Sequence, residues 1–174
     1  MKKNVEMRFS ERRRVEMNFH WPDLPLNIVL VEPSIPPNTG NISRLCAATG
    51  TRLHLIEPLG FDLSEKQLRR AGLDYWESVE LQTWPDFDTF AKQNPDGRKY
   101  FFSTGGSQNF FELDYRPGDY LIFGNETFGL SDKLLEKHAE HLCNIPIKLD
   151  HVRSLNLSNC AAIVLYEALR KINT

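Results

Sequence analysis

The chain has 174 residues, of which 41% are hydrophobic, 25% charged and 11% aromatic, and its formal net charge is −2. These values are typical of one globular domain with a substantial core, and they exclude a disordered or collagen-like chain. No apolar run approaches the roughly 18 residues of a membrane span, and the polar N-terminus is unlike a signal peptide. We therefore expect a cytoplasmic protein that does not enter a membrane.

The first segment, residues 1–25, carries six Lys or Arg residues against four acidic ones and is closed by Pro22 and Pro25. It is expected to lie outside the core of a folded domain that comprises residues 26–174. Two interpretations stay open for it. It is either a solvated, poorly ordered terminus or a basic arm that binds nucleic acid.

Residues 26–31 form a continuous apolar and β-branched run, which is typical of a central strand buried on both faces. The prolines at 33, 36 and 37 then favour an extended loop. A helix is predicted to begin at Asn38 and to end at Gly50, with an apolar stripe every three to four residues. This strand, loop and helix would be the first half of a βαβ unit.

The middle of the chain continues the alternation of strands and helices. Strands are predicted over 52–57, 78–82, 100–102, 121–123 and 142–147, and helices over 64–71, 86–93 and 131–141, with Pro85 at a first helical position. The alternation predicts an α/β fold with a mostly parallel sheet and helices on both faces. Because such sheets bind ligands at the carboxyl ends of their strands, loops 103–106, 124–130 and 148–156 are expected to converge on one pocket.

The last predicted helix, residues 157–171, has more apolar surface than one buried face requires. Its main stripe repeats at i, i+3, i+4 and i+7, and Ala162, Ile163 and Tyr166 lie off that stripe. A second subunit is a common partner for such an extra face, so a homodimer is expected. Four small polar residues gather at the start of the helix: Ser154, Asn156, Ser158 and Asn159. One suffices for capping, so the group is also expected to bind something polar.

No familiar catalytic motif is present. The chain has no phosphate loop, no GxGxxG fingerprint and no GxSxG elbow. His138 and His141 lie three residues apart with Cys143 just beyond, yet surface histidines explain this spacing better than a zinc site, and no metal is predicted. The three cysteines are expected to be reduced thiols.

Three motifs in order resemble those of the SPOUT superfamily of RNA methyltransferases. They are residues 38–46 (NTGNISRLC), residues 123–127 (FGNET), and residues 145–147 (IPI) with residues 154–159 (SLNLSN). Residues 53–61 and 68–75 further resemble the subgroup that 2′-O-methylates the wobble nucleotide of tRNA. The match covers about residues 26–171, but the subgroup usually has Pro at Asn125 and Arg at Phe128.

The resemblance implies a carboxyl-terminal trefoil knot, S-adenosylmethionine as the methyl donor, tRNA as the substrate, and a homodimer formed through the first and last helices. It also implies which residues hold the methyl donor, and loop position adds two more, Thr104 and Gly105. The predicted donor-binding residues are Phe102, Thr104, Gly105, Gly124, Ile145, Ser154 and Leu155. Backbone amides and carbonyls in these loops would suit the edge of an adenine ring.

The resemblance names Arg44 as catalytic, in the role of a base. Because a guanidinium holds its proton at neutral pH, we expect Arg44 instead to hold the adjacent phosphate and to stabilise the developing alkoxide. Asn38, Glu126, Ser154 and Asn156 are the other matching positions and are expected to orient the reactants. The basic pair Arg69 and Arg70 is expected to contact tRNA phosphates.

Two alternatives to a wobble-position enzyme stay open. One is the same reaction at another tRNA or rRNA nucleotide, and the other is an RNA-binding relative without activity.

Overall fold

The computed structural model describes residues 17–62, 78–148 and 150–174. The described strands are β1 (Asn27–Val31), β2 (Arg52–Ile56), β3 (Leu81–Trp84), β4 (Lys99–Phe102), β5 (Gln108–Asn109), β6 (Tyr120–Phe123) and β7 (Leu142–Asn144). The described α-helices are α1 (Pro36–Thr49), α3 (Phe87–Gln93), α4 (Asp132–Lys137) and α5 (Leu157–Ile172). The strands form one sheet in the order β3-β2-β1-β6-β4-β7-β5, and all of its pairs are parallel.

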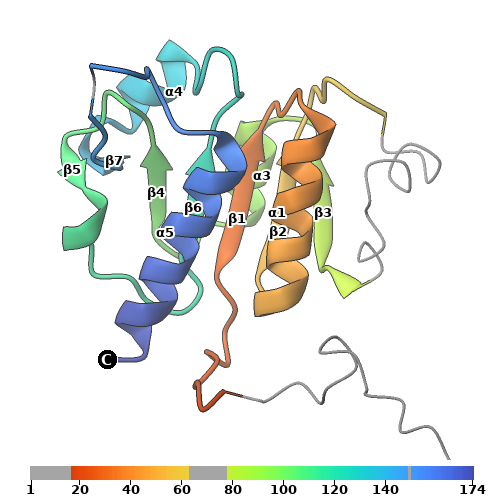
Figure 1. The fold of residues 1–174 in the computed structure, drawn as a ribbon. Coiled ribbons are helices and arrows are strands. Elements are labelled where there is room, and N and C mark those ends of the chain that lie inside the picture. The colour runs from red at the N-terminus through yellow and green to blue at the C-terminus, as the bar shows by residue number, and fades with distance from the viewer. Residues whose placement is uncertain (1–16, 63–77, 149) are drawn as a thin grey trace, which may run out of the picture.

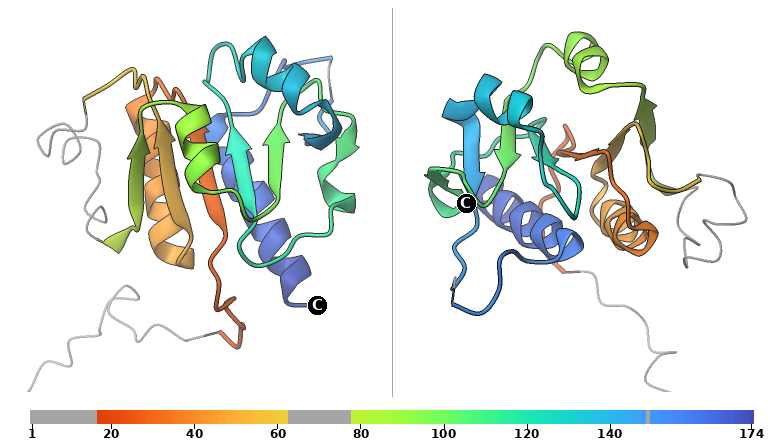
Figure 2. Two further views of the ribbon diagram at one scale, coloured as in Figure 1. Left: turned by 180° about the vertical axis from the view of Figure 1, so that it is seen from behind. Right: turned by 90° about the horizontal axis from the view of Figure 1, so that it is seen from above.

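Helices cover both faces of this sheet, as predicted. Helices α1 and α5 lie on the face that is turned to the viewer in Figure 1, whereas α3 and α4 lie on the opposite face, which the left view of Figure 2 shows. The α/β class and the parallel sheet are thereby confirmed. The trefoil knot stays a prediction.

Most element boundaries agree with the predictions, and the differences have local causes. Helix α1 begins at Pro36 rather than Asn38, because proline fits the first helical positions, and Gly50 ends it in the left-handed conformation at φ 66°. Pro85 does not lie inside α3, because Asp86 is the N-cap and accepts a hydrogen bond from the N–H of Thr89 at 2.6 Å. Strand β3 begins at Leu81, three residues later than predicted.

The carboxyl-terminal half shows three further differences. Strand β7 ends at Asn144, so residues 145–147 belong to the following loop rather than to the predicted strand. Helix α4 ends at Lys137, and a 3-10 turn over Ala139–His141 replaces its predicted last turn. The two-residue strand β5 was not predicted, because so short a segment has no periodic pattern of its own. The predicted helix 64–71 lies outside the described residues.

The core lies on both faces of the sheet, which explains why the β1 run is apolar without alternation. Ile28 and Leu30 pack with α1 and α5, whereas Val29 and Val31 pack on the other face with a group of aromatic rings. Those rings include Phe87 and Phe90 of α3 and Phe101 of β4. Successive strand residues point to opposite faces, so a strand buried on both needs an apolar residue at every position.

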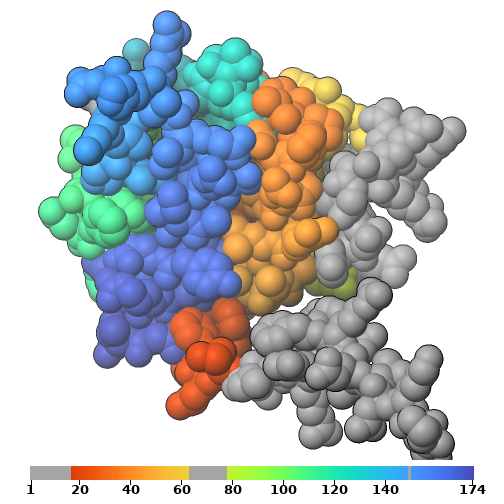
Figure 3. Space-filling model, in the orientation of Figure 1, coloured from red at the N-terminus to blue at the C-terminus, as the bar shows by residue number. Residues whose placement is uncertain are grey.

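Helix α5 buries its main stripe and exposes part of its second apolar face. Figure 3 shows α5 lying beside α1 on the same face of the molecule. On the outer side of α5, Ile163 and Tyr166 are 42% and 52% exposed. The predicted extra apolar surface is therefore open in a single chain. No helix in the described ranges combines the length and the apolar character needed to cross a membrane.

The described part of the predicted N-terminal extension touches the folded domain. Phe19 packs against the core cluster beneath α1 and α5, and the N–H of His20 donates to Oδ1 of Asn173 at 3.1 Å. These contacts tie the segment to the end of α5. Residues 1–16, which carry the predicted basic cluster, lie outside the described residues.

His54 of β2 is a buried polar residue in this core. It is 3% exposed, its Nε2 atom lies 3.2 Å from Oδ1 of Asn27, and its Nδ1 atom accepts a hydrogen bond from Nε1 of Trp84, also at 3.2 Å. This arrangement requires the neutral ring, with the proton on Nε2. Burial lowers the pKa of His54 to about 4.

We expect His54 to make the free energy of unfolding depend on pH. In the unfolded chain the ring has its ordinary pKa near 6.5, so as the pH falls from 7 to 5 the unfolded state gains a proton that the folded state does not. The wild type should lose roughly 2 kcal/mol of stability over this interval. Urea unfolding at several pH values measures it. His54→Gln should flatten the curve, and an unchanged slope would contradict the assignment.

Candidate active site

A cavity of about 780 Å³ lies where the strands end, between the loops that the sequence predicted to converge. The loops after β4, β6 and β7 all line it, together with the first turn of α1. Its volume is that of pockets which take drug-sized ligands. The convergence follows from the sheet, because parallel strands deliver their carboxyl ends to one edge.

Ten of the eleven predicted site residues line this cavity. They are Asn38, Phe102, Thr104, Gly105, Gly124, Glu126, Ile145, Ser154, Leu155 and Asn156. Arg44 is not among its lining residues and lies exposed on α1. It follows Asn38 by six residues, which places it about 9 Å further along the helix axis.

Glu126, Asn38 and Asn156 form a polar wall of the cavity, and the carboxylate of Glu126 has the most hydrogen-bond partners of the three. Its Oε2 atom accepts hydrogen bonds from the N–H and the hydroxyl of Ser34, at 2.8 and 2.9 Å. Its Oε1 atom accepts from the N–H of Ile35 at 3.2 Å and from the side-chain amide of Asn38 at 3.1 Å. Partial burial alone would raise the pKa of Glu126, but these donors outweigh it and lower the pKa. A carboxylate with this many partners is a structural anion that holds the loop before α1.

A chain of side-chain amides continues from Glu126 to the last helix. Because Nδ2 of Asn38 donates to Glu126, its Oδ1 atom is free to accept from Nδ2 of Asn156, at 2.9 Å. Oδ1 of Asn156 then accepts from the N–H and the hydroxyl of Ser158, at 2.9 and 2.7 Å, and so caps α5. One hydrogen-bonded chain therefore links all three predicted motifs. Asn156 therefore belongs both to the cap of α5 and to the polar wall.

The side chain of Asn125 links the turn at Glu32 to the loop that carries Glu126. Its Nδ2 atom donates to the carbonyl of Glu32 at 2.7 Å, and its Oδ1 atom accepts from the N–H of Thr127 at 2.8 Å. Glu32 has a positive φ of 52°, a conformation that costs energy for a residue with a side chain. The buried amide of Asn125 thus stabilises a strained turn, a role that a proline at this position could not fill.

The floor of the cavity is apolar and aromatic. The rings of Phe102 and Phe123 stack at a centroid distance of 4.9 Å and an interplanar angle of 17°. Ile145 and Leu155 extend this surface. Asn144, which no sequence motif marked, donates to the carbonyl of Thr104 at 3.0 Å and anchors the loop after β4. An apolar floor beneath polar loops fits a planar heterocycle such as adenine.

Backbone packing requires glycine at two positions of these loops but not at a third. A Cβ atom on Gly124 would lie 2.2 Å from the carbonyl carbon of Gly129 and 2.3 Å from the nitrogen of Leu130. A Cβ atom on Gly106 would likewise lie 2.5 Å from the carbonyl carbon and oxygen of Cys143. Gly124 and Gly106 therefore need glycine for backbone packing. At Gly105 the nearest atom is Oγ of Ser103 at 3.9 Å, so this position is open.

This contrast gives a matched pair of variants. Gly124→Ala should lower the free energy of unfolding by roughly 1–3 kcal/mol, because the methyl group meets backbone atoms that have no room to move. Gly105→Ala should change stability by no more than about 0.5 kcal/mol. Urea unfolding of the two variants measures the difference. Equal destabilisation of the two variants would show that the close backbone contact does not make Gly124 more sensitive to a side chain than Gly105.

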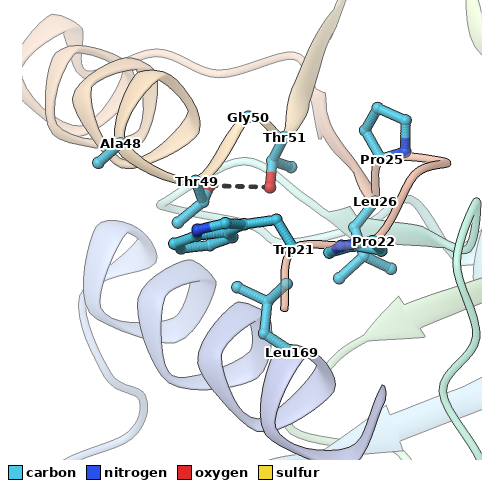
Figure 4. Close-up of a pocket in the computed structure, with 9 residues that line it drawn as sticks. All are labelled: Trp21, Pro22, Pro25, Leu26, Ala48, Thr49, Gly50, Thr51 and Leu169. Atoms are coloured by element: carbon cyan, nitrogen blue, oxygen red, sulfur yellow. Dashed lines mark hydrogen bonds between the residues drawn. The ribbon is translucent and has the colours of Figure 1, made fainter. Parts of the chain in front are cut away.

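A second, smaller cavity of about 250 Å³ lies at the amino ends of the strands, where β1 and β2 begin. Trp21 of the N-terminal segment lines it, and Figure 4 shows this ring between Thr49 at the end of α1 and Leu169 of α5. The hydroxyls of Thr49 and Thr51 lie 2.9 Å apart and hydrogen-bond each other. Both threonine hydroxyls are thereby paired, so this cavity offers few polar side chains that could orient a ligand.

Of the two histidines near the end of α4, His141 is exposed at the surface, as expected, whereas His138 packs against the sheet. The ring of His138 stacks on Phe101 at 4.2 Å and 15°, and burial is the largest cause that lowers its pKa. Cys143 is buried, and burial raises the pKa of its thiol to about 12. Across the described residues, no group of three or more His, Cys, Asp or Glu side chains could hold a metal ion.

Comparison with known proteins finds a family and close relatives. Residues 25–166 match the SpoU rRNA methylase family. The tRNA (cytidine(34)-2′-O)-methyltransferase of Saccharophagus degradans is 52% identical over 147 residues, which cover 84% of this chain and 95% of the relative. A solved structure concerned with 2-OH methylation of C/U34 on tRNA has a TM-score of 0.79 and 42% identity, covering 85% of this chain and 96% of that one. An AdoMet-bound rRNA methyltransferase from Sinorhizobium meliloti shares the fold, with a TM-score of 0.75 and 24% identity, and covers 87% of this chain and 58% of its own.

Proposed function

Because the chain belongs to the SpoU rRNA methylase family, we propose that it transfers a methyl group from S-adenosylmethionine to the ribose 2′-hydroxyl of nucleotide 34, cytidine or uridine, in tRNA. The main support for nucleotide 34 as the target is the 52% identity to a relative named tRNA (cytidine(34)-2′-O)-methyltransferase. The likeness to a structure concerned with C/U34 supports the same target.

S-adenosylmethionine, when bound, supplies a methyl group that is already electrophilic. The chain's own residues have to bind the donor and keep the transfer path free of water. Phe102, Gly124, Ile145 and Leu155 line the cavity and are the residues proposed to hold it, together with the loop that contains Thr104 and Gly105. The combination of an apolar floor and nearby backbone polar groups supports this assignment.

Arg44 is proposed to act on the RNA rather than on the methyl donor. It lies outside the cavity that would hold the donor, on the exposed side of α1. From there a protonated guanidinium can bind a phosphate next to the target ribose and lower the energy of the developing alkoxide. Asn38, Glu126 and Asn156 are proposed to set the start of α1, and thereby the position of Arg44, through their hydrogen-bonded chain.

We also propose that the enzyme works as a homodimer in the cytoplasm. The exposed Ile163 and Tyr166 on α5, next to α1, supply an apolar surface for a second copy. Ser154, exposed at the cavity rim, is proposed to help orient the reactants. The basic pair Arg69 and Arg70, proposed to contact tRNA phosphates, lies outside the described residues.

The experiment that tests this function is a methylation assay with nucleotide mapping. Purified protein and isotopically labelled S-adenosylmethionine are incubated with total tRNA from cells that lack 2′-O-methylation at position 34. Nuclease digestion and mass spectrometry then locate the modified ribose, and label is expected at position 34 in a subset of tRNAs. Label at another tRNA or rRNA nucleotide would replace the target, and no label with no binding of the donor would favour an inactive RNA-binding relative.

A further inference from the structure

We propose that Phe128 is a stacking platform for the base of the nucleotide being methylated. This inference rests on the proposed function and adds to it a residue that positions the substrate. Phe128 lines the large cavity and yet is 64% exposed. Its ring therefore stands at the cavity's mouth rather than in its floor.

The backbone beneath Phe128 is held in place. Asn125 and Gly129 exchange two backbone hydrogen bonds, at 3.0 and 2.9 Å, and close the turn that carries Thr127 and Phe128. Gly129 completes it with a φ of 73°, and the Asn125 side chain adds bonds to Glu32 and Thr127. A ring on a preformed turn needs little ordering when it binds a partner.

Packing within the chain does not account for this ring. No aromatic side chain of the described residues lies against it, whereas most of the other phenylalanines pair with another ring. A second apolar residue of the same mouth, Ile35, is 43% exposed. Exposed apolar side chains gathered at the mouth of a ligand cavity mark a surface that a partner covers.

The chemistry of the substrate indicates what covers it. For its 2′-hydroxyl to reach the cavity, the target nucleotide has to leave the base stack of the anticodon loop, and its base then needs a new stacking partner. Proteins that bind unstacked RNA bases supply aromatic side chains for this purpose. Stacking accepts any base face, so one phenyl ring serves cytidine and uridine alike. Arg153, exposed at the same cavity, offers a cation for the attached phosphate.

Three substitutions separate a stacking ring from an apolar contact. Phe128→Ala and Phe128→Leu should both raise KM for tRNA, by about 10-fold or more for the alanine variant, whereas Phe128→Trp should retain the wild-type KM. The affinity for S-adenosylmethionine and the melting temperature should stay unchanged. Phe111→Ala is the matched control, because Phe111 is 53% exposed but does not line the cavity. A wild-type KM for tRNA in Phe128→Leu would contradict the stacking role of the ring.

A fluorescent base identifies which nucleotide stacks. Pyrrolocytidine, whose emission falls on stacking, is placed in an anticodon stem-loop at the nucleotide that the wild type methylates, or at the next nucleotide. Binding should quench the first probe with wild type and with Phe128→Trp but not with Phe128→Ala. Quenching by Phe128 only at the neighbouring position would overturn the inference. If mapping places methylation away from position 34, the proposed target fails, while the same probe at the mapped nucleotide still tests Phe128.

Discussion

Arg44→Ala should abolish most methyl transfer while leaving the binding of S-adenosylmethionine nearly intact. The arginine lies on the exposed side of α1, outside the cavity proposed to hold the donor, so the substitution should remove the proposed contact with the RNA and leave the donor site unchanged. Loss of a single group that stabilises a developing oxyanion costs about 10²–10³-fold in kcat. Single-turnover methylation of tRNA measures the loss, and calorimetry with S-adenosylmethionine measures donor binding.

Two further variants make the Arg44 result specific. Arg44→Lys keeps the charge but loses the planar fork, so it should recover only part of the rate. Arg116→Ala removes another exposed arginine, which pairs with Asp114 away from the cavity, and should leave the rate unchanged. Loss of donor binding in Arg44→Ala would instead place the arginine in the donor half of the site.

Glu126→Gln is the second substitution with a large expected effect. The carboxylate accepts hydrogen bonds from Ser34, Ile35 and Asn38, whereas a glutamine has one acceptor oxygen and turns its NH₂ group toward donors. Some of these donors lose their partner, and bonds to a charged group are worth about 1.5–3 kcal/mol each. We expect a loss of about 2–3 kcal/mol in unfolding free energy and a large fall in activity, measured by urea unfolding and single-turnover methylation.

The pH dependence of Glu126 provides a separate check. Its pKa is lowered in the folded state, so its stabilising contribution is present above the ordinary value of 4.5 and is lost as the pH falls through the lower folded pKa. The Gln variant should lack this part of the acid transition. Glu136→Gln, an exposed carboxylate on α4, is the matched control and should behave as wild type. If Glu126→Gln were as stable as the wild type, the negative charge of Glu126 would not be needed to hold the polar wall together.

Local pattern predicted the elements that carry their own signal. The apolar run of β1, the left-handed Gly50 after α1 and the stripe of α5 each follow from periodicity or from a glycine's freedom at positive φ. Boundaries set by contacts elsewhere were placed less well. The start of β3 depends on its pairing with β2, and β5 exists only through its pairing with β7.

The sequence by itself determined the fold class, the family and the loops that form the cavity, because strand order along the chain and three ordered motifs are local information. Only the tertiary structure decided how these residues act together. Ser34 and Glu126 are 92 positions apart, and Asn38 and Asn156 are 118 apart, so no periodicity could reveal their hydrogen bonds. The same holds for Gly124, where the backbone of Gly129 leaves no room for a side chain, and for the exposed ring of Phe128. Such features depend on which segments the sheet brings together, and that is set by packing of the whole domain.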